Sequence, residues 1–108
     1  MSEVVLTQVD AGKSISVRPG DTIIVRLPEN PTTGYEWTVD TADDEIVGLR
    51  GSDFILSPTV AMGSGGTRAF TFGTKEPGMG RICLKYWRAW EGESSVRDHF
   101  DVAIHASN

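Results

Sequence analysis

Residues 22–39, TIIVRLPENPTTGYEWTV, decide the fold. Residues 22–27 and 35–39 alternate apolar and polar side chains with a period of two, which predicts two β-strands. Residues 28–34 between them restrict the backbone at almost every position. Pro31 fixes φ, Thr32 and Thr33 are β-branched, and Gly34 permits a positive φ. The stretch therefore predicts two strands joined by a loop that holds one shape against something else.

The period of two continues along the rest of the chain, and no segment has a convincing amphipathic helical pattern. Turn signals at Pro19-Gly20-Asp21 and Pro77-Gly78-Met79-Gly80 separate the alternating runs. We therefore expect an all-β sandwich of about seven to nine short antiparallel strands, formed by one domain over residues 1–108. Trp37 is the expected core tryptophan. The further predicted strands cover residues 14–18, 46–55, 67–74, 81–86 and 100–105.

Composition excludes several classes of partner. The net charge is −5 with no basic stripe, which argues against nucleic acid. No apolar run is long enough to cross a bilayer, so no membrane association is expected. The single cysteine excludes an intrachain disulfide. The chain starts without a secretory signal, which favours the cytoplasm; a secreted, periplasmic or lysosomal location follows if a signal was removed. We expect a monomer.

The sequence offers no usable catalytic constellation. His99 and His105 lie six residues apart on one predicted strand, about 20 Å at 3.3 Å per residue, so they cannot bind one metal. Ser94 and Ser95 lack the context of a nucleophile elbow. We therefore expect no catalytic residue, no metal, no cofactor and no enzymatic activity.

Two further segments are unusual for connecting loops. Gly63-Ser64-Gly65-Gly66 is either a flexible hairpin tip or exposed backbone that pairs with a partner, with Met62 as a small apolar anchor. Arg88-Ala89-Trp90 combines the two residue types most enriched at binding hot spots. Its alternative interpretation is that Trp90 folds back on the rim of the core with Arg88 stacked on it. Even numbers of strands separate the three loops, so all three can share one end of a sandwich.

At this point the chain resembles the chagasin-like inhibitors of papain-family cysteine peptidases. That family carries three loop motifs: NPTTG followed by an aromatic residue, GxGG, and Arg-Pro-aromatic. The first stands here at residues 30–35, the second at 63–66 and the third at 88–90, where Ala89 replaces the family's proline. The order and spacing agree over nearly the whole chain.

The resemblance implies an immunoglobulin-like sandwich that is a reversible, non-covalent inhibitor of papain-like, cathepsin L- or B-like cysteine peptidases. Its three loops would enter the active-site cleft, with the first in the centre. The alternative is a carbohydrate- or ligand-binding sandwich that uses Trp87 and Trp90 as a platform. The expected peptidase-binding residues are Asn30, Pro31, Thr32, Thr33, Gly34, Tyr35, Met62, Gly63, Ser64, Gly65, Gly66, Arg88, Ala89 and Trp90.

Overall fold

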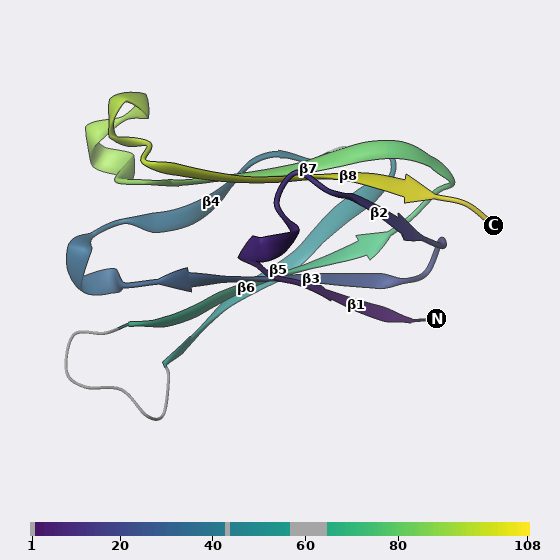
Figure 1. The fold of residues 1–108 in the computed structure, drawn as a ribbon, viewed down its shortest axis with the longest axis horizontal. Helices are drawn as coiled ribbons and strands as arrows, with labels where there is room; N and C mark the ends of the chain where they lie inside the picture. The colour runs from purple at the N-terminus through teal and green to yellow at the C-terminus, as the bar shows by residue number, and fades with distance from the viewer. Residues whose placement is uncertain (1, 43, 57–64) are drawn as a thin grey trace.

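The computed structural model describes residues 2–42, 44–56 and 65–108, and these form two four-stranded sheets packed face to face (Figure 1). The first sheet has the strand order β1-β3-β6-β5 and the second has the order β2-β8-β7-β4. The strands are β1 (Glu3–Leu6), β2 (Ser14–Val17), β3 (Thr22–Glu29), β4 (Glu36–Ala42), β5 (Val47–Leu56), β6 (Gly66–Thr74), β7 (Gly78–Trp87) and β8 (Asp98–Ala106). The all-β sandwich expected from the alternating pattern is confirmed, and it agrees with the immunoglobulin-like sandwich that the resemblance implies.

The inward faces of the strands form one apolar core. Trp37 is only 4% exposed, so its predicted place in the core is correct. The alternation of the sequence appears directly as alternating burial, because successive side chains of a strand point to opposite faces. The largest fully buried side chains are Phe72, Phe100, Ile23, Leu27, Ile82, Leu84, Ile104, Val25, Val47 and Val102.

The expectation of antiparallel strands throughout is wrong at one edge of each sheet. β1 runs parallel to β3, with Glu3 opposite Thr22, and β2 runs parallel to β8, with Ser14 opposite Ala103. The other four pairings among the described residues are antiparallel. Alternation identifies the inward face of a strand but carries no information about its direction, which explains the error.

The first and third of the segments singled out in the sequence, residues 30–35 and 88–90, lie at one end of the sandwich, and both termini lie at the other (Figure 1). The short 3₁₀ helix η2 (Pro31–Thr33) joins β3 to β4, and η3 (Ala89–Glu91) and η4 (Glu93–Ser95) join β7 to β8. The facing ends of β5 and β6 lie there too. The remaining 3₁₀ helix, η1 (Gln8–Asp10), follows β1. Within the described part of the chain, no helix is long and apolar enough to span a bilayer.

Candidate functional site

The side chain of Asn30 organises the loop between β3 and β4. Its Oδ1 accepts hydrogen bonds from the Thr32 amide at 3.1 Å and from the Thr32 hydroxyl at 2.6 Å. Its backbone carbonyl accepts from the Thr33 hydroxyl at 2.8 Å and from the Thr33 amide at 3.2 Å. Asparagine commonly bonds the backbone two residues on in this way and so stabilises a turn. The loop is therefore held by its own side chains as well as by the backbone restriction of proline and threonine.

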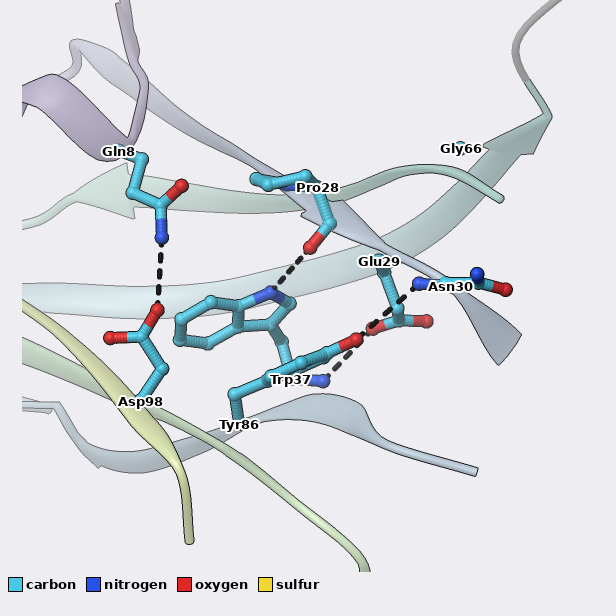
Figure 2. A pocket seen from close by; sticks show the side chains of 8 residues that line it. All are labelled: Gln8, Pro28, Glu29, Asn30, Trp37, Gly66, Tyr86 and Asp98. Atoms are coloured by element: carbon cyan, nitrogen blue, oxygen red, sulfur yellow. Dashed lines mark hydrogen bonds between the residues drawn. The ribbon is translucent and has the colours of Figure 1, made fainter. Parts of the chain in front are cut away.

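Trp37 and Tyr86 form the base of this loop (Figure 2). The indole Nε1 of Trp37 donates to the carbonyl of Pro28 at 2.9 Å, and the ring stacks on Tyr86 with 4.9 Å between ring centroids. The Tyr86 hydroxyl accepts from the Asn30 amide at 3.4 Å. The loop therefore begins and ends on aromatic side chains that reach into the core.

Arg88 connects the third loop to the first. Its Nε and Nη2 both donate to the carbonyl of Thr33, at 3.1 and 3.0 Å. Its guanidinium carbon lies 4.5 Å from the ring centroid of Tyr35, and that of Arg97 lies 4.7 Å from the same centroid. Arg88 thus stacks on Tyr35, and not on Trp90 as the alternative interpretation of this segment had it. Arg88 braces the back of the central loop.

Trp90 is not folded onto the rim of the core. It is 72% exposed, and its ring instead lies against Gly34. A Cβ added to Gly34 would come within 2.4 Å of the ring carbon Cη2, and Gly34 has a φ of +78°. Beside this contact is an open pocket lined by Glu29, Gly34, Tyr35, Glu36, Arg68 and Trp90. The interpretation of Trp90 as a core-rim residue is wrong.

The second loop is described only at its return to the sheet. The predicted residues Met62, Gly63 and Ser64 lie outside the described residues. Gly65 has a φ of +78°, and a Cβ there would lie 2.5 Å from the carbonyl oxygen of Glu29 and 2.8 Å from Cα of Asn30. Gly66 opens β6 opposite Glu29. Glycine at position 65 therefore allows the second loop to approach the backbone of the first, for which any side chain would be too large.

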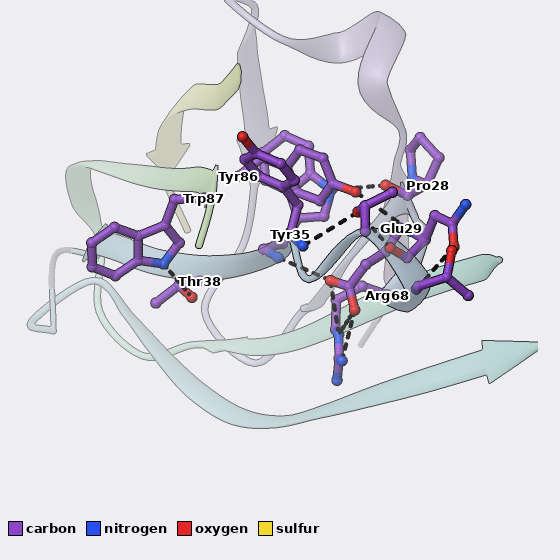
Figure 3. A network of polar contacts seen from close by, with 11 residues as sticks. Pro28, Glu29, Tyr35, Thr38, Arg68, Tyr86 and Trp87 are labelled. Atoms are coloured by element: carbon purple, nitrogen blue, oxygen red, sulfur yellow. Dashed lines mark hydrogen bonds and ion pairs between the residues drawn. The ribbon is translucent and has the colours of Figure 1, made fainter. Parts of the chain in front are cut away.

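A buried ion pair beneath the loops was missed by the sequence reasoning (Figure 3). Arg68 Nη2 donates to Glu29 Oε1 at 2.8 Å, and the side chain of Glu29 is only 2% exposed. The carboxylate raises the pKa of Arg68 above its usual value, chiefly through this hydrogen bond. A signal existed in the pattern: Glu29 follows Ile23, Val25 and Leu27 at inward positions, and Arg68 precedes Phe70 and Phe72.

The candidate site can bind a partner through its shape, its exposed backbone and its hydrogen bonds, but the part of it that the structure describes contains no reactive group. Among the described residues, no group of three or more His, Cys, Asp or Glu side chains is placed to hold a metal. The sugar-platform alternative gains no support, because Lys85 Nζ lies 3.7 Å from the ring centroid of Trp87. The Trp87 indole also donates to the hydroxyl of Thr38 at 3.1 Å. Trp87 is therefore engaged with its own strand neighbours, while Trp90 belongs to the loop end.

Comparison with known proteins shows which family the chain resembles over most of its length. The family described as "Chagasin family peptidase inhibitor I42" matches residues 16–104. Chagasin from Trypanosoma cruzi is 28% identical over 107 residues, which cover 94% of this chain and 96% of the relative. Amoebiasin-1 from Entamoeba histolytica is 30% identical over 95 residues, covering 85% and 89%.

A solved structure agrees over almost the full length of both chains. The crystal structure of the cysteine protease inhibitor EhICP2 from Entamoeba histolytica superposes with a TM-score of 0.85 at 20% identity. The superposition covers 99% of this chain and 97% of the other. The family match also confirms the expectation that the chain is not an enzyme. The chain therefore belongs to the chagasin family of peptidase inhibitors.

Proposed function

We propose that this chain inhibits papain-like cysteine peptidases of the cathepsin L or B type by inserting the three loops into the active-site cleft. The central element is the loop of residues 30–34, flanked by the second loop at Gly65–Gly66 and by the third at Arg88–Trp90. Binding is reversible and non-covalent. The assignment to peptidase inhibition follows from the family, and the loop assignment rests on the geometry of this chain.

The observation that carries the loop assignment is that the flanking segments contact the central loop directly. Arg88 donates twice to the Thr33 carbonyl, Trp90 lies against Gly34, and Gly65 lies against Asn30. A loop that is already ordered loses little conformational entropy on binding, so more of the contact energy appears as affinity. The three segments are therefore suited to bind as one preformed unit.

Resistance to cleavage follows from the engagement of the loop carbonyls. A cysteine peptidase attacks a peptide carbonyl whose oxygen is free to enter an oxyanion hole. The carbonyl oxygen of Asn30 already accepts from Thr33, and that of Thr33 accepts from Arg88. The amide that would leave after attack on the Asn30 carbonyl belongs to Pro31, which has no N–H. Attack on the Asn30 or Thr33 carbonyl would therefore have to break these hydrogen bonds first, which disfavours cleavage of the loop at both positions.

Trp90 supplies the exposed apolar anchor of the binding end. Tryptophan is among the residue types most enriched at binding hot spots, and this one is 72% exposed while held on Gly34. An interface of roughly 1,600–2,000 Å² is expected, as for protease–inhibitor complexes in general.

The direct test is titration of papain and of a cathepsin L-like peptidase with the purified chain, with a serine peptidase as the control. We expect stoichiometric loss of both cysteine peptidase activities, full recovery on dilution and no effect on the serine peptidase. Mass spectrometry after long incubation should recover the intact inhibitor. No inhibition of either cysteine peptidase, or a covalent adduct, would contradict the proposal.

A further inference from the structure

Beneath the loops, the carboxylate of Glu29 lies at the point where four strand ends meet. Glu29 ends β3, just before the central loop, and its Oε2 accepts from the backbone amide of Trp37 at 2.9 Å, just after that loop. Its Oε1 accepts from Arg68 in β6, just after the second loop. Arg68 in turn lies over the ring of Phe54 in β5, at 5.4 Å from the ring centroid. One pair thus contacts the strands on both sides of both loops.

The pair is built into the inner face of the first sheet. Glu29 is directly opposite Gly66, and Arg68 is opposite Leu27, so the two side chains reach each other diagonally across β3 and β6. Nε of Arg68 also lies 3.2 and 3.3 Å from the two carboxylate oxygens, which makes the contact broad rather than a single bond. The carboxylate is nearly excluded from water, while 23% of the Arg68 side chain remains exposed.

We infer that Glu29 and Arg68 are positioning residues for inhibition: they fix the first loop relative to the ends of β5 and β6 before the peptidase binds. Neither residue belongs to a loop motif or to the exposed tip. The effect on inhibition rests on the proposed function. The ordering of the loop by this ion pair is a property of the free protein and can be measured without a peptidase.

A positioning role is physically reasonable because a buried ion pair is a weak source of stability. The desolvation cost of two charges roughly offsets their attraction, and replacement by apolar residues of similar size is often neutral or stabilising. A planar guanidinium that faces a carboxylate does, however, fix orientation strongly. The backbone amide of Trp37 adds a further directional contact to the Glu29 carboxylate. Trp37 lies on the edge strand β4, so without Glu29 this amide would have no partner strand to donate to. The pair therefore serves orientation more than folding.

The test compares three changes at the pair with one control. Glu29→Gln keeps the shape and removes the charge, Arg68→Met removes the guanidinium, and Glu29→Leu/Arg68→Met replaces the pair by apolar side chains. Arg81→Met is the matched control, since Arg81 pairs with Asp101 on the outer face of the second sheet with both side chains about half exposed. Inhibition constants against papain are measured well below the melting temperature of each variant, where circular dichroism shows it folded.

We expect each folded variant of the pair to have an inhibition constant raised about tenfold, because only a fraction of the free molecules then has the binding-competent loop arrangement. The double variant should recover melting temperature relative to Arg68→Met but should not recover inhibition. Arg81→Met should inhibit like the parent. Inhibition within twofold of the parent by any folded variant of the pair would overturn the inference.

Hydrogen exchange of the free protein separates this inference from the proposed function. The amides of Thr32, Thr33, Tyr35 and Trp37 should exchange about tenfold faster in Glu29→Gln than in the parent if the pair orders the loop. Unchanged exchange would overturn the positioning role even if the parent inhibits papain. A parent that fails to inhibit, with exchange raised as expected, would instead contradict only the proposed function.

Discussion

The ring of Trp90 occupies the space into which a side chain at Gly34 would have to project. The separation between an added Cβ and ring carbon Cη2 would be 2.4 Å, less than any real contact. Gly34 is the last residue before Tyr35 in the central loop, whereas Trp90 lies in η3 of the third loop. The glycine of the first motif and the tryptophan of the third are therefore in direct contact. The Trp90 ring can lie in this position only because residue 34 has no side chain.

Gly34→Ala should weaken inhibition of papain at least about tenfold, because the methyl group displaces the Trp90 ring and the backbone is strained at a φ of +78°. Gly12→Ala is the matched control. Gly12 has a φ of +84°, lies outside the three loops, and has no atom within 4 Å of an added Cβ. Inhibition constants and melting temperatures of both variants separate backbone strain from the loop contact. Equal inhibition by the two variants would show that the Gly34–Trp90 contact does not matter.

Trp90→Ala should cost about 2 kcal/mol or more in binding and almost nothing in stability, since the side chain is largely exposed in the free protein. Met79→Ala provides the comparison, because Met79 is 70% exposed and lies near the start of β7, away from the loops. Calorimetric binding constants for papain and urea unfolding curves are the measurements. A large loss of stability with unchanged affinity would assign Trp90 to structure rather than binding.

Ala89→Pro should preserve or improve inhibition. Ala89 is the first residue of η3, a position that tolerates proline well, and Arg88 before it already has the extended φ of −103° and ψ of 107°. The loop is further held by Ser95, whose hydroxyl accepts from the Arg88 amide at 3.0 Å and donates to the Gly92 carbonyl at 2.7 Å. Proline should therefore restrict mainly the unfolded chain. Measured inhibition that falls strongly would show that this chain needs the Ala89 amide or its mobility.

Because of Asp21, the free energy of unfolding should fall as the pH is lowered into the acid range. The backbone amides of Arg18 and then Ser2 donate to its carboxylate at 2.9 and 2.8 Å and lower its pKa below the ordinary value of about 3.8. Between the folded-state and the unfolded-state pKa of Asp21, the unfolded chain therefore binds more protons than the folded protein. The stabilisation by the Asp21 carboxylate is present above about pH 4 and is lost as pH falls through the folded-state pKa. Urea unfolding at pH 7 and pH 3 should show a smaller loss in Asp21→Asn than in the parent. Asp53→Asn, at an exposed position of β5, should behave like the parent; identical losses in all three proteins would contradict this role.

The sequence predicted the layers of the fold because burial on one face of a strand leaves a period-two pattern. It also located the loop end, since an even number of strands separates the three loops. It did not predict the strand β1, where Glu3 to Leu6 pair in parallel with β3. Residues 3–6, Glu-Val-Val-Leu, do not alternate polar and apolar side chains, whereas the equally short edge strand β2, Ser14–Val17, does alternate and was predicted. The direction of β1 depends on a partner distant in the chain.

The sequence analysis identified the residues of the loop motifs as the candidate site but did not identify the side chains beneath them. Motif residues such as Gly34 and Arg88 stand out because their backbone or charge is unusual locally, but the contact between Arg88 and Thr33 is a tertiary one. Glu29 and Arg68 were missed because neither residue belongs to one of the three loop motifs. Only the register of β3 against β6 brings the two together. The sequence contained the clue, a charge at an inward position in each strand, but not the pairing.

The most direct test of the central claim is protection of the papain active-site cysteine from alkylation by iodoacetamide. The parent chain and Thr32→Arg, which places a long charged side chain on an exposed position of the central loop, are compared at equal concentrations after circular dichroism shows both folded. We predict that the parent blocks alkylation at one equivalent and is recovered with its mass unchanged, while Thr32→Arg leaves the cysteine reactive. Equal protection by both chains, or alkylation in the presence of excess parent, would contradict the claim that this loop covers the nucleophile.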